Sequence, residues 1–237
     1  MGTVVNIPIF GVSGCGKTRA VIELLSQHWG FYFNAAGDDW GSDDVSTLHD
    51  TVETYLPDTQ EFLPVDREAN NRFARKTTLL LFLSRLLIFR YCLRIPGSSK
   101  AFTSAKWTLL QVCPHVLFGQ DIFNTLFSQV VELCRHHGEI ELSDFVSELL
   151  DKTRDFMVKH GCLPNIKGNT RFLVVHDEAQ ILGDAFNTFK STSSSDNSPR
   201  PLLSPILAAF RDIGQNQLSH HVRHWPLYQY HLLDPGL

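Results

Sequence analysis

Residues 11–18 combine residue types and spacing that suit the binding of a phosphate group. Their sequence, GVSGCGKT, fits the pattern G-x-x-x-x-G-K-[ST] of the phosphate-binding P-loop, also called Walker A. Glycines let backbone N–H groups turn inward around an anion, and a helix that starts at the loop adds the positive end of its dipole. We expect Lys17 to reach the β- and γ-phosphates and Thr18 to hold Mg²⁺. The alternative is a chance match to an ordinary glycine-rich turn.

The sequence on either side of this loop predicts the strand and the helix that would position it. Residues 4–10 are mostly apolar and rich in β-branched side chains, which indicates a short strand. From Val21 to Trp29 apolar residues recur at helical spacing, and Gly30 is a helix stop. We therefore expect the nucleotide to contact Gly11, Val12, Ser13, Gly14, Cys15, Gly16, Lys17, Thr18 and Arg19.

Residues 172–178 form the second half of the predicted site. An apolar run ends there in Asp177 and Glu178, as in a Walker B strand. Asp177 is expected to bind Mg²⁺ through water, opposite Thr18. Glu178 and Lys17 are the expected catalytic residues, and Glu178 would orient the attacking water. A strand that ends in acidic turn residues is the ordinary alternative, but the combination with a complete P-loop favours one nucleotide site. Nothing in this pattern explains His176, for which a core histidine with satisfied hydrogen bonds is the default.

The composition is that of a folded protein with one sizeable domain. The chain has 237 residues, of which 43% are hydrophobic and 19% charged, and its net charge of −4 gives no indication of nucleic-acid binding. Five scattered cysteines without a C-x-x-C pair predict free thiols in a reducing compartment. Residues 77–95 are the most apolar stretch, but Arg85 and Arg90 interrupt them, which predicts a buried helix and no membrane span. With no signal peptide, we expect an intracellular protein of the cytoplasm or nucleus.

The remaining patterns predict an α/β fold with a mainly parallel sheet and a large helical insertion. Residues 31–36 indicate a second buried strand, and residues 57–165 are helical, which is too long for a simple crossover. We place the domain at residues 1–213, with a flexible loop at about 190–200 and a loosely packed, atypical tail at 214–237.

An acidic loop follows the second predicted strand, at the edge where doubly wound sheets bind ligands. Ser42 is a candidate cap for a helix over residues 43–55. Asp43 or Asp44 would contact Mg²⁺ or a partner, or both would be solvated residues of a cap and turn. Residue type alone favours the second option.

Two known families share parts of this pattern. Residues 177–180, Asp-Glu-Ala-Gln, match the DEAQ box of some RNA helicases, but the chain carries no second helicase core, no Ser-Ala-Thr motif and no arginine-rich final motif. The chain more closely resembles the P-loop NTPase domain of the Crinkler (crinkling-and-necrosis) family of fungi and oomycetes. The Gly-Phe-Tyr-Phe and Arg-Pro-Leu-Leu-Ser-Pro segments make this match specific. The matching segments follow the family's order and are residues 9–19, 30–33, 41–44, 172–180 and 200–207.

The resemblance implies a nucleoside-triphosphatase module of an intracellular effector or conflict protein, which acts in some cases in a host nucleus. In the family this domain follows a ubiquitin-like N-terminal domain and precedes a C-terminal effector. We expect this chain to lack the ubiquitin-like domain and to be truncated at its C-terminus. The strand that senses the γ-phosphate in the family is also expected to be missing, because residues 214–226 have no apolar run of four and include Pro226. We therefore expect one flank of the strand at residues 172–176 to lie open and to invite self-association.

We expect Mg²⁺-dependent binding and hydrolysis of ATP. ATP is preferred to GTP because the Asn-Lys-x-Asp motif that reads guanine is absent. The alternatives are a nucleotide-dependent switch with negligible turnover and an inert truncated fragment, while a DEAQ-box helicase has less support. The expected partners are the nucleotide itself and a second copy of the chain, bound through the nucleotide site or an open sheet edge. Neither nucleic acid nor a membrane is indicated.

Overall fold

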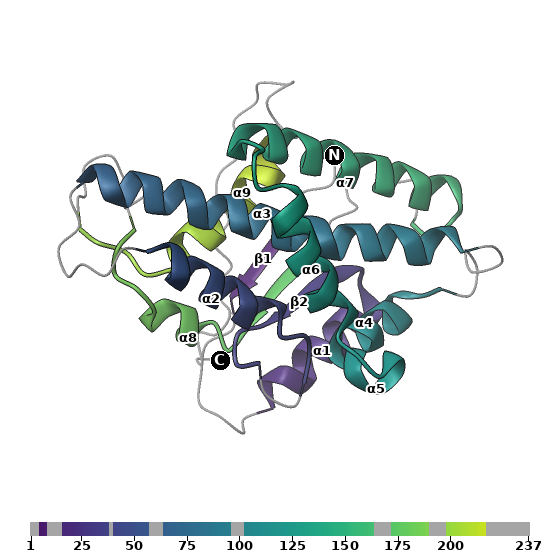
Figure 1. Ribbon diagram of the computed structural model, residues 1–237. Helices are drawn as coiled ribbons and strands as arrows, with labels where there is room; N and C mark the ends of the chain where they lie inside the picture. The colour runs from purple at the N-terminus through teal and green to yellow at the C-terminus, as the bar shows by residue number, and fades with distance from the viewer. Residues whose placement is uncertain are drawn as a thin grey trace, which may run out of the picture.

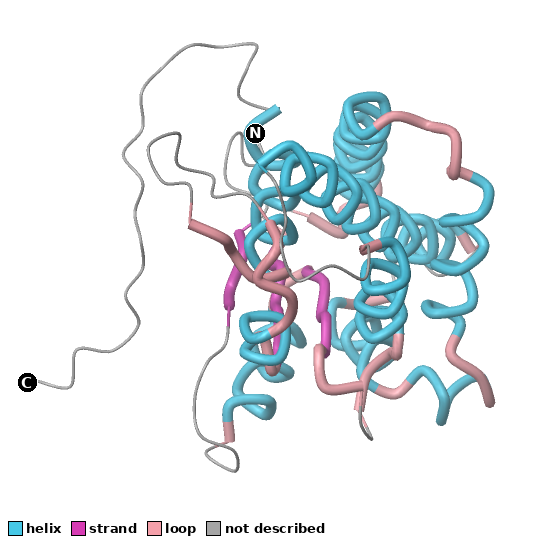
Figure 2. Tube along the Cα trace, turned by 60° about the vertical axis from the view of Figure 1, so that its left-hand side comes forward, coloured by secondary structure: helices cyan, strands magenta, loops and turns pink. Residues whose placement is uncertain are grey.

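Helices pack on both sides of a small sheet, as Figures 1 and 2 show. The structure is a computed structural model. It describes residues 5–8, 16–37, 40–56, 64–95, 102–163, 172–189 and 198–216. The predicted phosphate-binding residues Gly11 to Cys15, most of the flexible loop at 190–200 and most of the tail at 214–237 lie outside these ranges.

Three parallel strands form the sheet. They are β1 (Val5–Pro8), β2 (Gly30–Asn34) and β3 (Leu173–Asp177). Their order is β1-β3-β2, so β3 is the central strand. Because all three strands run in the same direction, their carboxyl ends meet at one edge, where Asn34 is aligned with Asp177. The prediction of an α/β fold with a parallel sheet is confirmed.

The prediction that one flank of β3 lies open is wrong. β1 pairs with one edge of β3 and β2 pairs with the other. No further strand is needed beside β3, because direct pairing with β1 already supplies this neighbour. Within the described ranges no further strand pairs with β1, and the loss of a C-terminal part of the sheet stays a prediction.

The helices account for most of the described chain, and five of them, α3 to α7, lie within the predicted insertion between β2 and β3. In chain order the helices are α1 (Lys17–Gln27), α2 (Asp44–Tyr55), α3 (Pro64–Arg94), α4 (Ser104–Val112), α5 (Pro114–Phe118), α6 (Ile122–Leu133), α7 (Glu139–Lys159), α8 (Gln180–Asp184) and α9 (Leu203–Asn216). The apolar segment at residues 77–95, which was predicted to form a buried helix, belongs to the single long helix α3, which ends at Arg94.

The two faces of the sheet bury different side chains, because neighbouring residues of a strand point to opposite faces. Tyr32 lies on the face covered by α1, in a small core with Leu25 of that helix. Phe31 lies on the other face and contacts Phe82 of α3, with their ring centroids 4.8 Å apart. Figure 1 shows α1 and α3 on opposite sides of the strands. Asn34, two positions after Tyr32, is aligned with Asp177, so Asp177 also lies on the sheet face that α1 covers.

Gly30 allows α1 to pack closely against the start of β2 and β3. A Cβ atom at this position would lie 2.5 Å from the Leu173 carbonyl oxygen and 2.6 Å from Leu25 Cδ2. The Leu25 side chain could turn away, but the contact with the Leu173 carbonyl oxygen could be relieved only by a movement of the backbone. The glycine that opens the Gly-Phe-Tyr-Phe segment is thus required by the approach of helix and strand.

Side chains of α4 cover the outer edge of β2. Trp107 Nε1 and Gln111 Nε2 donate to the Gly30 carbonyl oxygen at 2.7 and 3.2 Å, and the Tyr32 backbone N–H donates to Gln111 Oε1 at 2.9 Å. Trp107 and Gln111 lie one helical turn apart, so one helix face satisfies two backbone groups of the strand. An edge whose backbone groups are satisfied in this way is a poor template for a strand of another chain.

Two predictions from composition agree with the described ranges. Most of the apolar side chains between residues 79 and 93 of α3 are buried in the core, and no helix of the described chain is long and apolar enough to cross a membrane. No disulfide joins the cysteines that the structure describes, which are Cys92, Cys113, Cys134 and Cys162.

Asp44 forms a buried ion pair with Arg85 of α3. Arg85 Nε and Nη2 donate to the two carboxylate oxygens of Asp44 at 2.6 and 2.8 Å, and both side chains are inaccessible to solvent. The guanidinium also packs over the Phe123 ring at 4.2 Å. Asp44 is therefore not the solvated residue that its type favoured, although Ser42 does accept a hydrogen bond from its backbone N–H. The pair fixes the start of α2 against α3 and α6.

His176 is buried between aromatic rings. Its ring stacks on Phe33 at 5.6 Å and meets Phe210 at 5.0 Å, and its Nε2 atom has no hydrogen-bond partner. The expectation of a core histidine is confirmed, but not the expectation that its hydrogen bonds are satisfied. Burial lowers the pKa of His176 to about 4, because the charged imidazolium would lose its hydration.

We predict that the free energy of unfolding falls as the pH drops from 6.5 towards 4, because the unfolded chain binds a proton at His176 and the folded chain does not. The loss is about 3 kcal/mol when the pH reaches the folded pKa, at 1.36 kcal/mol per pKa unit. Urea unfolding across this range measures it, and His176→Leu should remove most of it. An identical pH dependence in the wild type and in His176→Leu would contradict the prediction.

Candidate functional site

Thr18 and Asp177 meet at the carboxyl edge of the sheet. Asp177 ends β3 and is 1% exposed, and Thr18 is the second residue of α1. The Thr18 hydroxyl Oγ1 donates a hydrogen bond to Asp177 Oδ2 at 2.8 Å. Both residues were predicted metal ligands, and the fold brings them together although 159 positions separate them in the sequence.

The first turn of α1 points its backbone N–H groups towards this same edge. Gly16, the residue before the helix, has a φ of 82°, which favours glycine because a Cβ atom would be strained there. Lys17 is half-buried and Arg19 is exposed, each within two residues of the helix start. The helix start, with its positive dipole end, is thus next to the Asp177 carboxylate.

Tyr32 is a member of this site that the sequence analysis missed. Its hydroxyl donates to Asp177 Oδ2 at 2.9 Å, and its side chain is almost fully buried. Burial, and then the charge of Asp177, raises the pKa of Tyr32, so that the phenol stays protonated and remains a donor. The available signal was a single hydroxyl in a phenylalanine-rich strand, on the same face as Asp177.

Hydrogen-bond donors surround the carboxylate of Asp177. Oδ2 accepts from Thr18 and Tyr32, and Oδ1 accepts from the Glu178 backbone N–H at 3.1 Å. An acceptor with three donors is the arrangement expected of an ionised carboxylate. A negative oxygen next to the Thr18 hydroxyl oxygen is the kind of hard ligand set that Mg²⁺ prefers.

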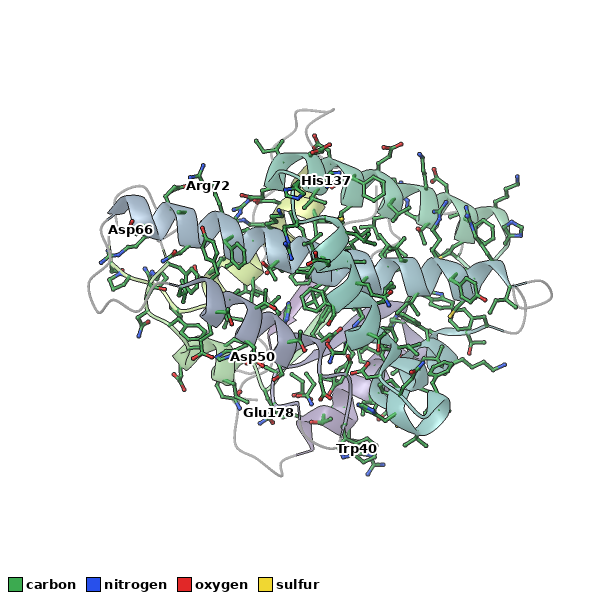
Figure 3. All side chains as sticks on the ribbon, viewed as in Figure 1. Trp40, Asp50, Asp66, Arg72, His137 and Glu178 are labelled. Atoms are coloured by element: carbon green, nitrogen blue, oxygen red, sulfur yellow. The ribbon has the colours of Figure 1, made fainter. Side chains whose placement is uncertain are left out.

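Glu178 adopts an unusual backbone conformation directly after this carboxylate. Its φ is 51°, a left-handed value that few residues other than glycine adopt. The Gln180 side-chain amide Nε2 donates to its carboxylate oxygen Oε2. Glu178 is half-buried and lies at the same side of the molecule as Trp40, as Figure 3 shows. Strain of this kind often occurs at functional sites.

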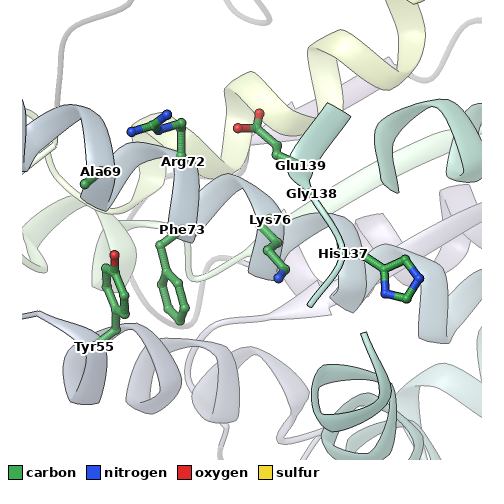
Figure 4. Close-up of a pocket in the computed structure, with 8 residues that line it drawn as sticks. All are labelled: Tyr55, Ala69, Arg72, Phe73, Lys76, His137, Gly138 and Glu139. Atoms are coloured by element: carbon green, nitrogen blue, oxygen red, sulfur yellow. The ribbon is translucent and has the colours of Figure 1, made fainter. Parts of the chain in front are cut away.

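A surface pocket of about 280 Å³ lies away from this carboxylate edge, between α2, α3 and the start of α7 (Figure 4). Arg72, Lys76 and His137 line it, together with Tyr55 and Phe73, whose stacked rings are 3.7 Å apart. Figure 3 shows Arg72 and His137 on the opposite side of the molecule from Glu178. The pocket contains none of the predicted site residues that the structure describes.

Comparison with known proteins gives no relative for this chain: no family model, no curated protein and no solved structure matches it. The features that bear on function are the motifs in the sequence and the geometry around Asp177.

We predict that Tyr32→Phe lowers the free energy of unfolding by about 1.5–3 kcal/mol, the range for a hydrogen bond to a charged group. The substitution removes one hydroxyl, and the flanking residues of β2 are themselves phenylalanines. Urea unfolding measures the change. Tyr91→Phe, at a side chain that is 70% exposed, is the matched control and should leave stability unchanged. Equal stability of the two variants would show that the bond to Asp177 contributes nothing.

Proposed function

We propose that the chain is a P-loop NTPase that binds ATP with Mg²⁺ at the carboxyl edge of the sheet. The observation that carries the proposal is the hydrogen bond between Thr18 and Asp177. These are the residues that the Walker A and Walker B patterns assign to one magnesium ion. A chance glycine-rich turn and an unrelated acidic strand end have no reason to meet within 2.8 Å.

In this proposal the phosphates lie at the start of α1. Gly11 to Gly16 would surround them with backbone N–H groups, Lys17 would contact the β- and γ-phosphates, and the neighbouring Arg19 would add positive charge. Because α1 starts beside Asp177, phosphates bound there would be close to that carboxylate and would repel it. The positive charge of a magnesium ion would offset this repulsion.

The ligands for Mg²⁺ would come from Thr18 and Asp177. When bound, the ion would neutralise charge on the phosphate oxygens. The Thr18 hydroxyl, which now donates to Asp177, would turn its oxygen towards the ion, while the Asp177 carboxylate would bind through water. Tyr32 would keep its bond to Oδ2 and hold the carboxylate in place.

Glu178 is the proposed catalytic base. It follows Asp177 directly at the carboxyl edge of the sheet, and its backbone has a left-handed conformation of the kind often found at functional sites. From this position its carboxylate would orient the water that attacks the γ-phosphate. Lys17 would act with it by stabilising charge on the transferred phosphoryl group.

A nucleotide-dependent switch with negligible turnover is the second candidate. The bond from Gln180 to the Glu178 carboxylate favours it, because an oxygen that already accepts a hydrogen bond is a weaker base. The resemblance to Crinkler NTPase domains suits either candidate and is the basis for proposing an intracellular effector, in the cytoplasm or in a host nucleus.

We predict that Lys17→Ala abolishes ATP binding, because the sequence motif assigns no other cation to the β- and γ-phosphates. Calorimetric titration of the full chain with Mg-ATP measures this. The matched control is Lys152→Ala on the exposed face of α7, which should bind like the wild type. Binding by Lys17→Ala within about threefold of wild type, or roughly 0.7 kcal/mol, would refute the assignment of the phosphate loop.

We predict that Glu178→Gln keeps ATP binding and loses hydrolysis, since the amide has nearly the shape of the carboxylate but is not a base. Single-turnover assays with excess protein measure the rate, and Glu148→Gln on α7 is the matched control. Turnover equal to the wild type would move the base to another residue. A wild type that binds ATP but shows no turnover would select the switch.

A further inference from the structure

Asp43, His115 and Asp121 converge from three separate segments. Asp43 precedes α2, His115 lies in α5, and Asp121 precedes α6. His115 Nε2 lies 3.7 Å from Asp43 Oδ2 and 3.8 Å from Asp121 Oδ2. All three ligand atoms lie within 4.8 Å of one another. Of the three, only Asp43 was a candidate metal contact from the sequence, and we call the set the His115 cluster.

The distances in the His115 cluster are longer than hydrogen bonds. A hydrogen bond between these atoms would bring them to about 2.7–3.2 Å. Two ligands of one zinc ion, each about 2.1 Å from the metal, lie about 3.4 Å apart at a tetrahedral angle. The two distances from His115 are near this value, so a small shift of the exposed side chains would close the site around an ion.

Asp121 is held in a fixed orientation by backbone donors. Its Oδ1 accepts from the N–H groups of Phe123 and Asn124 at 3.0 and 3.1 Å, and its Oδ2 accepts from the Asp43 N–H at 2.8 Å. Its side chain is only 7% exposed. Each carboxylate oxygen has two lone pairs, so Oδ2 keeps one for a further partner. Buried ligands oriented by hydrogen bonds of this kind are typical of metal sites.

The charge around the cluster is negative. Asp43, Asp44 and Asp121 bring three carboxylates to the start of α2 and α6, and Asp44 already has the whole bidentate contact of Arg85. In the described part of the chain, His115 is the basic group within 4 Å of Asp43 and Asp121. A divalent cation between the three ligand atoms would balance the charge of the two carboxylates.

We propose that Asp43, His115 and Asp121 bind a divalent transition-metal ion of the Zn²⁺ type. One imidazole and two carboxylates suit such an ion, whereas Mg²⁺ and Ca²⁺ prefer oxygen ligands. Asp43 and His115 are about half exposed, so water completes the coordination. The ion joins the loop after β2 to α5 and α6. This cluster shares no residue with the site at Thr18 and Asp177, and the proposal does not depend on nucleotide binding.

Chemical modification of histidines with diethyl pyrocarbonate, read residue by residue by mass spectrometry, tests the proposal on the full chain. Zinc should slow modification of His115 in the wild type, because a metal-bound nitrogen is not nucleophilic. His160, exposed at the end of α7, is the reference histidine within the same protein. A rate at His115 that is unchanged by saturating Zn²⁺ would overturn the proposal, whatever other histidines bind.

Asp43→Asn is the matched variant. The Asp43 side chain caps no helix N–H group, and its bond to Asp121 comes from the backbone, so the variant should fold like the wild type. Loss of one carboxylate ligand should lower the zinc affinity at His115 by about tenfold or more, by analogy with the effect of outer-shell partners. Equal protection of His115 in the wild type and in Asp43→Asn would show that these residues do not share an ion.

Discussion

The rest of the structure depends on the hydrogen bonds that the buried Asp177 carboxylate accepts. It lies at the end of the central strand and accepts hydrogen bonds from Thr18 of α1 and Tyr32 of β2. One buried charge thus joins the first helix and two strands of the sheet. A buried carboxylate without donors would be strongly destabilising. Thr18, Tyr32 and the Glu178 backbone N–H are the three donors that make its burial possible. The same requirement leaves a negative oxygen beside the start of a helix, where a cation and a phosphate can both be bound.

The small sheet depends on helices for its stability. β3 has a strand on either side, while β2 has the side chains of Trp107 and Gln111 along its outer edge. These two residues come from the long helical insertion, and so does Arg85, which pairs with Asp44 beneath the start of α2. The insertion is therefore part of the core and not an appended domain. Its removal would expose the edge of β2 and leave a buried carboxylate unpaired.

Local patterns were sufficient to predict the elements around the candidate site. Strands at residues 4–10, 31–36 and 172–176 and the helix after the phosphate loop follow from apolar spacing and glycine positions, which act over a few residues. The contact of Thr18 with Asp177 was also predictable, because parallel strands place their carboxyl ends at one edge. These features are encoded in short segments and in one rule of topology.

The features that the sequence analysis missed depend on residues far apart in the chain. The hydrogen bonds of Tyr32 with Asp177 and with Gln111 join residues that are 145 and 79 positions apart in the sequence, and no local pattern specifies either contact. The error about the open flank of β3 has the same origin. Which strand pairs with β3 depends on the three-dimensional arrangement of the strands, and the preferences of single residues do not determine it. The residue type of Asp44 favours a solvated turn, and nothing near it in the sequence indicates its pairing with Arg85, 41 positions away.

The most direct test of the account is a calorimetric titration of the full chain with ATP, once with Mg²⁺ and once with the metal chelated. The wild type should bind ATP at one site, and Mg²⁺ should tighten binding by about tenfold or more, which corresponds to about 1.4 kcal/mol. Asp177→Asn should still bind ATP but should lose this dependence on Mg²⁺. A wild type without saturable binding, or with the same affinity in the presence and absence of Mg²⁺, would contradict a shared role of Thr18 and Asp177 in holding the metal ion of a nucleotide.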